Sequence, residues 1–490
     1  MALTKVLSTL LDLRANTNQA DNNTAAGVEA LTNTDAPPIS GQLTQKNTAY
    51  GYYALNANDQ GFGSTAIGFE ALKLANTDGV SASTAVGANA LANTTTGGGN
   101  TAIGHDACFK NTTGNLNVAI GKGALYSNDT GSFNIAIGLD ALGTGLYPVA
   151  GKAGDNNVAI GFNAITIAQA ADNNVAIGHQ SGANLSTAET CVMIGVDAMQ
   201  GNATTPTTNR SINSVAVGYR ALYQVANLAN NNVSVGAFSS YFNATGDENT
   251  VVGTSAHYGE AGLAPYENVA MGSTAMYSIT SGGRNVAIGK GALYEARNGT
   301  GHVAVGFAAM PISSNGANYN TALGYGSATD LSGGSNNTCI GNNAGNLTSP
   351  FNIVAQSNRV VVGDSSVTNA YIQVAWTVVS DERDKTDIED VSYGLDFISK
   401  LRTVKFKRDN RNRYDGGVSD GSKKDDNFTY GFLAQNVIQA EKDCGATDDS
   451  LLVINNEDPE NLKIIETSVI PALVKAIQEL KAEIEFLKAK

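Results

Sequence analysis

A nine-residue phrase that recurs along most of the chain limits its fold more than any other feature. The phrase reads Asn-Val-Ala-Ile-Gly-x-x-Ala-Leu, and one clean copy begins at Asn117. Its glycine occurs nineteen times between Gly27 and Gly363, which gives eighteen spacings between successive glycines. Ten of these spacings have the same number of residues as the spacing from Gly104 to Gly121. A fixed spacing with variable insertions is typical of a stacked repeat array. The sequence therefore predicts a mainly β chain with about 19 stacked repeats.

Physical constraints on the phrase predict the shape of one repeat. The Val-Ala-Ile run alternates its side chains between two faces, as a β-strand does. The later Ala-Leu pair can reach the face of the central Ala only if the chain turns, and glycine favours such a turn because it adopts positive φ readily. We expect strand, bend, strand and then a polar loop, as at residues 111–114. A single coil cannot bury its own apolar face, so residues 23–379 should stack into a β-solenoid rod.

Two features of the repeats are candidates for recognition. Longer insertions, as at residues 147–155 and 204–213, should project from the rod, and variable loops on a rigid scaffold often bind partners. A tyrosine also follows the phrase in several repeats. These tyrosines could stack on sugars or on one another, and their regular register favours a stacked ladder that covers the edge of the core. They are Tyr126, Tyr223, Tyr258, Tyr277 and Tyr294.

Composition excludes several classes of function. A formal net charge of −14 argues against a nucleic-acid partner, since phosphate binding needs clustered Lys and Arg, and the basic stretch at residues 405–413 is interpreted as a solvated face. Four cysteines do not make a disulfide framework, and four histidines lack metal-ligand spacing, so neither a metal nor another cofactor is expected. No secretory signal or membrane-spanning run is apparent, which predicts a protein made in the cytosol. Residues 1–22 are interpreted as an attachment or disordered segment.

Charge density changes abruptly at Ser380. Residues 1–379 carry 34 charged side chains (13 Lys+Arg and 21 Asp+Glu), whereas residues 380–490 carry 40 (17 and 23). We place a domain boundary there, after a β-strand expected over residues 371–379. Residues 380–490 should then form a conventional α+β domain.

The C-terminal end carries a heptad pattern at about residues 468–490. Apolar residues follow one another at steps of 3, 4, 3, 4 and 3, which is the a/d seam of a coiled coil. This pattern indicates that chains associate through helices, with three strands as one of several possible numbers. The seam consists of Ile470, Leu473, Ile477, Leu480, Ile484 and Leu487.

The repeats resemble the head repeats of trimeric autotransporter adhesins, which have similar Val-Ala-Ile-Gly phrases. That resemblance implies left-handed parallel β-rolls assembled as trimers. The period here is longer and less uniform, and the outer-membrane anchor of those adhesins is missing. The resemblance therefore extends to the architecture and not to the secretion route.

Residues 380–490 resemble the intramolecular chaperone domain of phage tail spikes and fibres, which is also found behind endosialidases. The motifs that carry this resemblance are residues 380–385, the Gly-Leu-Asp-Phe-Ile and Phe-Lys pieces, Gly-Phe-Leu-Ala-Gln and the terminal heptads. In that family the domain drives trimerisation and then cuts itself off. The resemblance implies a scissile bond between Val379 and Ser380, with Ser380 as the nucleophile and Lys385 as the base.

The resemblance predicts a homotrimeric tail fibre or spike of a virion, assembled in the host cytoplasm. Its partners are expected to be other tail or baseplate proteins and a glycan or protein receptor on the host surface. Two alternatives remain open at this point. A glycan-degrading tail spike would need a fixed pair of carboxylates, for which the repeats give no pattern. A cellular trimeric adhesin would need a signal peptide or an anchor.

Overall fold

The computed structural model describes residues 23–32, 46–58, 61–75, 82–143, 154–166, 170–185, 187–201, 210–224, 229–243, 245–260, 265–313, 316–349, 351–373, 380–414, 416–447, 453–455 and 462–490. The expected attachment segment, residues 1–22, lies outside these ranges, as do parts of both longer insertions. The chain divides into two compact units, one ending at Asp364 and one beginning at Ser365. The boundary placed at Ser380 from charge density lies inside the second unit.

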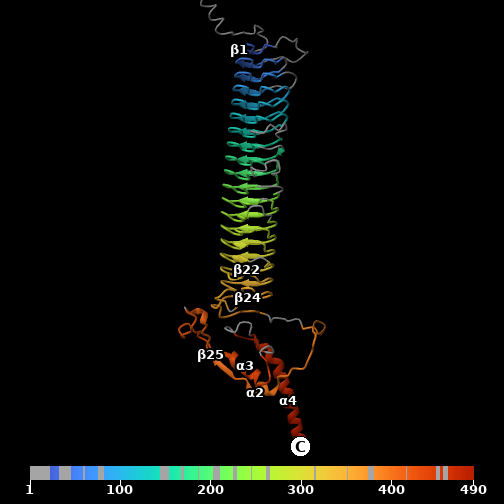
Figure 1. Ribbon diagram of the computed structural model, residues 1–490, viewed down its shortest axis with the longest axis vertical. Helices are drawn as coiled ribbons and strands as arrows, with labels where there is room; N and C mark the ends of the chain where they lie inside the picture. The colour runs from blue at the N-terminus through green and yellow to red at the C-terminus, as the bar shows by residue number, and fades with distance from the viewer. Residues whose placement is uncertain are drawn as a thin grey trace, which may run out of the picture. The chain divides into compact units, whose positions relative to one another are not determined.

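Within the described residues of the first unit, nineteen short strands form one sheet (Figure 1). Each strand pairs in parallel with the strand of the next coil and in register, as where Ala102 lies opposite Ala119. The predicted β-solenoid of about 19 coils is therefore confirmed. The strands are β1 Thr24–Ala26, β2 Thr48–Tyr50, β3 Thr65–Ile67, β4 Thr84–Val86, β5 Thr101–Ile103, β6 Val118–Ile120, β7 Ile135–Ile137, β8 Val158–Ile160, β10 Val175–Ile177, β12 Val192–Ile194, β14 Val215–Val217, β15 Val233–Val235, β16 Thr250–Val252, β17 Val269–Met271, β18 Val286–Ile288, β20 Val303–Val305, β22 Thr321–Leu323, β23 Thr338–Ile340 and β24 Val360–Val362.

Two smaller parallel sheets accompany this main sheet where the intervening segments are described. One has three strands and the other has two. They are β9 Ala170–Asp172 with β11 Thr187–Glu189 and β13 Arg210–Ile212, and β19 Glu295–Ala296 with β21 Ile312–Ser313.

The second half of the phrase forms turns, so the strand expected there was wrong. In the coil after β5, Asp106 and Cys108 have φ of 59° and 52°, which is the left-handed region. These turns direct both Ala107 and Cys108 into the core, where both are fully buried. A strand could not do so, because it sends neighbouring side chains to opposite faces. The coil is therefore one strand and a chain of tight turns, closed by hydrogen bonds to the next coil.

The phrase glycine is required where successive coils approach most closely. Gly121 has φ of 133°, and a Cβ at that position would overlap the carbonyl oxygen of Gly138 in the next coil. Equivalent close approaches repeat from coil to coil along the stack. Glycine thus sets both the bend and the spacing between coils.

A buried asparagine precedes most strands and joins each coil to the next. Asn117 Oδ1 accepts the backbone N–H of Asn134 at 3.0 Å, and Asn117 Nδ2 donates to the carbonyl of Gly131 at 2.8 Å. The Asn117 N–H in turn donates to Asn100 Oδ1 at 2.8 Å. We call this column the asparagine ladder. Its members that accept the next coil's N–H are Asn47, Asn100, Asn117, Asn134, Asn157, Asn174, Asn232, Asn249, Asn268, Asn285, Asn320 and Asn337.

The second unit is the α+β domain that the sequence predicted. Its core includes Phe397, Val437, Val453 and Ala472. Of the strand expected over residues 371–379, residues 371–373 are not in a strand and the rest lie outside the described ranges. The elements are η1 Glu382–Asp384, α2 Leu395–Lys400, β25 Thr403–Phe406, η2 Arg411–Arg413, β26 Thr429–Phe432, α3 Ala434–Lys442, β27 Ile454–Asn455, β28 Lys463–Ile464, η3 Glu466–Ser468 and α4 Val469–Ala489, with β25 antiparallel to β26 and β27 to β28.

None of the helices in the described ranges is both long and apolar enough to cross a membrane.

Replacing Asn117 tests the asparagine ladder. We expect Asn117→Leu to destabilise the coils by about 1–3 kcal/mol, because it leaves the buried N–H of Asn134 without its acceptor. Asn117→Ser should cost less, since serine occupies the same position at Ser64 and Ser83. Asn342→Ala, which removes an exposed side-chain bond, is the control. Denaturant unfolding measures the difference, and equal stability of Asn117→Leu and Asn342→Ala would contradict the ladder.

Two buried histidines predict a loss of stability in acid. His257 occupies the Leu position of its repeat and His302 the asparagine-ladder position, and burial lowers the pKa of each to about 4 from 6.5. The unfolded chain therefore takes up protons first, so this stability is complete above about pH 6.5 and is lost as the pH falls towards 4. The comparison is with the double variant His257→Leu, His302→Asn. Between about pH 6.5 and 4, the unfolding free energy of the wild type should fall by a few kcal/mol more than that of the variant. If the difference in unfolding free energy between the wild type and the double variant does not change with pH, this expectation is refuted.

Candidate functional site

The loop that follows the predicted scissile bond forms one tight turn. Asp381 caps the short helix η1 by accepting the N–H of Arg383 at 2.9 Å, and the N–H of Lys385 donates to the carbonyl of Glu382 at 3.1 Å. A turn of this size reverses the chain within six residues. Lys385 is thereby returned to the side of Ser380.

Ser380 and Lys385 are in direct contact. Lys385 Nζ lies 2.7 Å from Ser380 Oγ and 3.1 Å from the Ser380 carbonyl oxygen. Both residues are exposed in the single chain. A charged lysine donates this hydrogen bond, whereas a neutral amine in the same place could accept the serine proton. Ser380 and Lys385 therefore have the geometry of a serine–lysine pair, and both are exposed to water.

An ion pair joins two other charged side chains of the loop, Asp381 and Arg383. Arg383 Nη2 lies 2.6 Å from Asp381 Oδ2, and hydrogen bonding from Arg383 lowers the pKa of the Asp381 carboxyl. Asp381 therefore stays ionised and occupied with Arg383. The arrangement leaves Lys385 as the basic side chain beside the serine.

Val379, on the other side of the predicted bond, lies among residues 374–379, outside the described ranges. Its geometry relative to Ser380 Oγ stays a prediction.

The predicted seam lies on α4, and all six of its residues are between 41% and 65% exposed. The neighbouring face of the helix is used within the chain: Val469, Ala472 and Ala476 are buried, and Glu479 accepts the N–H of Leu395 at 2.7 Å. One face of α4 therefore packs against the domain, while the heptad face stays open to water in the single chain.

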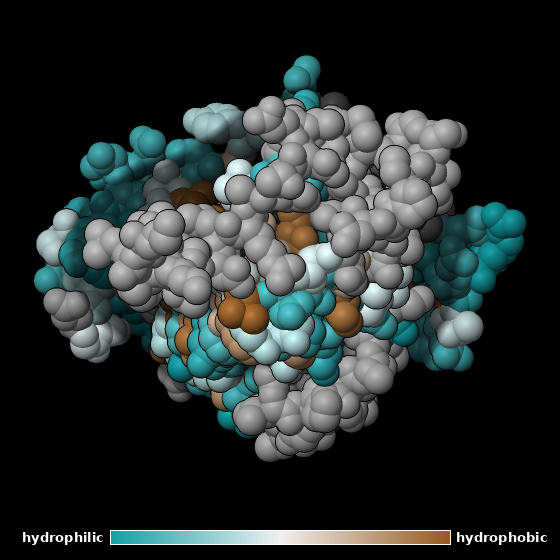
Figure 2. Space-filling view, turned by 90° about the horizontal axis from the view of Figure 1, so that it is seen from above, coloured by the Kyte–Doolittle hydropathy of each residue, from teal (hydrophilic) through white to brown (hydrophobic). Residues whose placement is uncertain are grey.

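The outer face of the nineteen-stranded sheet is a second apolar surface. The third residue of each strand points away from the core, and in many strands it is an exposed isoleucine. Examples are Ile67, Ile103, Ile120, Ile177, Ile194, Ile288 and Ile340. Apolar residues also reach the surface among polar ones in the view of Figure 2. The sequence analysis missed this face, although burial of the central Ala in Val-Ala-Ile requires Ile to point outward.

Four of the five tyrosines that the sequence analysis named form the expected ladder, together with Tyr241, which it missed. Tyr223, Tyr241, Tyr258, Tyr277 and Tyr294 stack in one column, with ring centroids 4.9–5.0 Å apart. All five rings are half-buried. Because the stacked faces cover one another, a sugar could reach the edges and hydroxyls of the inner rings and not their faces. Tyr126 stacks separately on Phe109, at 5.3 Å.

Groups of three or more metal-ligating side chains are absent from the described ranges.

The C-terminal unit is similar to a known protein family. Residues 380–446 match the family described as the chaperone of endosialidase, a peptidase family. A search of curated proteins found no match. The matched stretch begins at Ser380 and includes Lys385, helix α2 and the β25–β26 hairpin. The chain thus combines a β-solenoid of stacked coils with a C-terminal segment that matches the chaperone of endosialidase family, a combination that fits a phage tail fibre with a C-terminal chaperone domain.

Proposed function

We propose that this protein is a phage tail fibre that contacts the host surface, and that its C-terminal domain trimerises the fibre and then cuts the chain before Ser380. The observation that carries the proposal is the 2.7 Å contact between Lys385 Nζ and Ser380 Oγ, at the first residue of the matched family segment. The virion is the proposed location, with other tail or baseplate proteins as partners and a host glycan or protein as receptor.

Cleavage would proceed in two steps. Neutral Lys385 Nζ takes the hydroxyl proton of Ser380 while Oγ attacks the carbonyl carbon of Val379. A C–O bond forms as the C–N bond to Ser380 breaks, and the proton passes to the departing amine, which leaves an ester. Water then hydrolyses the ester to give a Val379 carboxylate and the free hydroxyl and amine of Ser380.

Exposure of the pair suggests how cleavage is timed. In a single chain, the side chains of Ser380 and Lys385 are exposed to water. Covering the loop with neighbouring copies would remove that water and favour the neutral amine that the reaction needs. Cleavage before Ser380 would then occur only after the chains have assembled.

Support for a homotrimer comes from two apolar surfaces and from the family. The seam residues of α4 and the outward isoleucines of the sheet are exposed in one chain, and apolar residues aligned in this way favour an interface. The chaperone of endosialidase family acts in trimerisation, which is consistent with three copies.

A removable chaperone suits this architecture. Every strand of the main sheet pairs with a strand from another coil, and parallel pairing of this kind nucleates slowly. Holding chains together at one end raises their effective concentration and sets their register. After the cut the assembled rod would be kinetically trapped.

The serine–lysine pair is tested by variants of both residues. The wild type should yield a fragment that begins at Ser380 and spans residues 380–490. Ser380→Ala and Lys385→Ala should remain full length, with cleavage slowed by about 10²-fold or more. Lys385→Arg keeps the charge but cannot act as a base at neutral pH, so it should also stay uncut. Intact mass and N-terminal sequencing give the answer, and normal processing of any of these variants would exclude the assigned role.

The seam is tested by one charge placed at its centre. Leu480→Glu should lower the yield of assembled fibre, because each chain loses about 1.5–3 kcal/mol of apolar burial. Gln478→Glu adds the same charge at an exposed position beside the seam and serves as the control. Analytical ultracentrifugation measures the trimer fraction. If both variants assemble equally well, α4 is not the assembly interface.

A further inference from the structure

A braced loop in the C-terminal unit holds a segment that lies upstream of the predicted cut. Within this loop, the Tyr414 hydroxyl donates to Asp409 Oδ1 at 2.5 Å and accepts the N–H of Lys423 at 2.6 Å. Asp409 Oδ2 also accepts the N–H of Gly421 at 2.9 Å. These three hydrogen bonds lie within residues 409–423 and brace the loop around η2.

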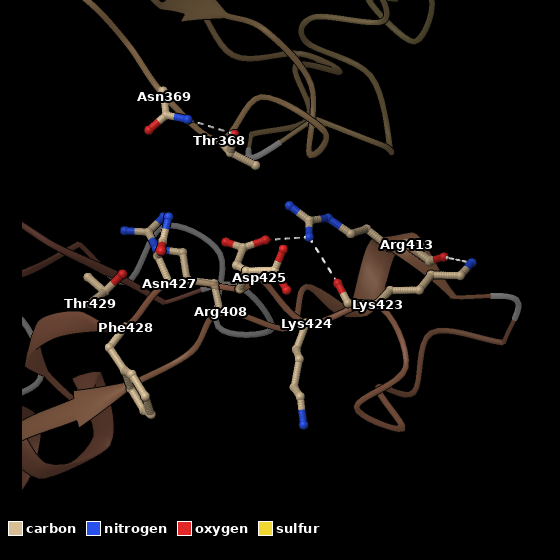
Figure 3. A pocket seen from close by; sticks show the side chains of 11 residues that line it. Thr368, Asn369, Arg408, Arg413, Lys423, Lys424, Asp425, Asn427, Phe428 and Thr429 are labelled. Carbon is tan, nitrogen blue, oxygen red and sulfur yellow. Dashed lines mark hydrogen bonds and ion pairs between the residues drawn. The ribbon is translucent and has the colours of Figure 1, made fainter.

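Arg413 projects from this loop and binds acceptors on both sides of it. Nε and Nη2 donate to the carbonyl oxygen of Ser365 at 3.1 and 3.0 Å, while Nη1 donates to Asp425 Oδ1 at 2.8 Å and to the Lys423 carbonyl at 3.1 Å. Only 19% of the Arg413 side chain and 23% of the Asp425 side chain are exposed. Figure 3 shows Arg413 directed at Asp425 and Lys423, with Thr368 and Asn369 of the upstream segment lining the same pocket.

Arg413 and Ser365 lie on opposite sides of the predicted cut in the sequence. Ser365 follows β24, the final strand of the main sheet, and precedes Ser380 by fifteen residues, whereas Arg413 follows Ser380. The hydrogen bonds of Arg413 to Ser365 therefore join the two pieces that a cut before Ser380 would produce.

We infer that Arg413, oriented by Asp425, is a clasp that keeps the C-terminal fragment bound to the fibre after cleavage. The partner surface is the fibre's own segment that begins at Ser365. This inference rests on the proposed cleavage, and it separates cutting from release: the cut is set at Ser380, and the lifetime of the fragment on the fibre is set at Arg413. A planar guanidinium suits this role because it reaches a carbonyl and a carboxylate at once, which an ammonium group does not.

The test uses the full chain with an N-terminal affinity tag and with a protease recognition site in place of residues 374–379. Cut protein is immobilised by the tag, and loss of the C-terminal fragment is followed over time. We expect Arg413→Ala to speed dissociation by about 10- to 100-fold, the loss typical of hydrogen bonds to a charged group, and Arg413→Lys to fall between. Arg402→Ala removes an exposed arginine of the same unit and should match the wild type.

Asp425→Asn is the second variant, because it keeps the side-chain volume while removing the charge that orients Arg413. Faster release from Asp425→Asn supports the clasp even if Arg413→Ala does not assemble. Release of both variants at the wild-type rate would overturn it.

A parallel sample with the natural residues 374–379 separates this inference from the proposed function. If that sample stays uncut while the protease-cut fragment is retained through Arg413, self-cleavage fails and the clasp stands. If it cuts itself but all variants release alike, self-cleavage stands and the clasp fails.

Discussion

The solenoid depends on hydrogen bonding between equivalent positions of successive coils, and the asparagine ladder is its buried part. An amide side chain there satisfies a backbone N–H in one direction and donates to a carbonyl in another, so the turn of each coil carries no unpaired polar group at that point. The low dielectric of the core strengthens these bonds and makes their loss costly. Small Ala side chains and the glycine spacing then follow, since coils must lie close enough for the amides to reach.

The same geometry explains why a single chain exposes ordered apolar residues. A strand of three residues buries only its middle side chain, so a Val-Ala-Ile strand that fills the core with Ala must present Ile to the outside. Helix α4 repeats this division, with Ala472 and Ala476 packed inward and the heptad residues outward. Both units therefore expose ordered apolar surfaces in the single chain, as expected of a protein that matures by association.

In the proposed function, the C-terminal unit combines a loop that cuts the chain with a second loop that holds the cut fragment. Ser380 and Lys385 meet because a capped helical turn reverses the chain within six residues, which is a local property. Arg413 meets Ser365 across 48 residues of sequence, which is not. Cutting and holding are thus assigned to different loops, and one can change without the other.

The sequence by itself determined the stacked coils, their number, the stacking of the tyrosines and the α+β nature of the C-terminal unit. The coils and the tyrosine stack follow from short-range spacing that repeats along the chain, and the α+β unit was expected from the change in charge density. The pairing of Ser380 with Lys385 was an implication of the family resemblance. Only the tertiary structure decided that the Ala-Leu half of the phrase forms left-handed turns, that the phrase asparagine bridges coils and that Arg413 reaches Ser365. Those outcomes depend on which backbone groups lie opposite one another after stacking and packing, and a residue pattern read along one chain does not contain that pairing.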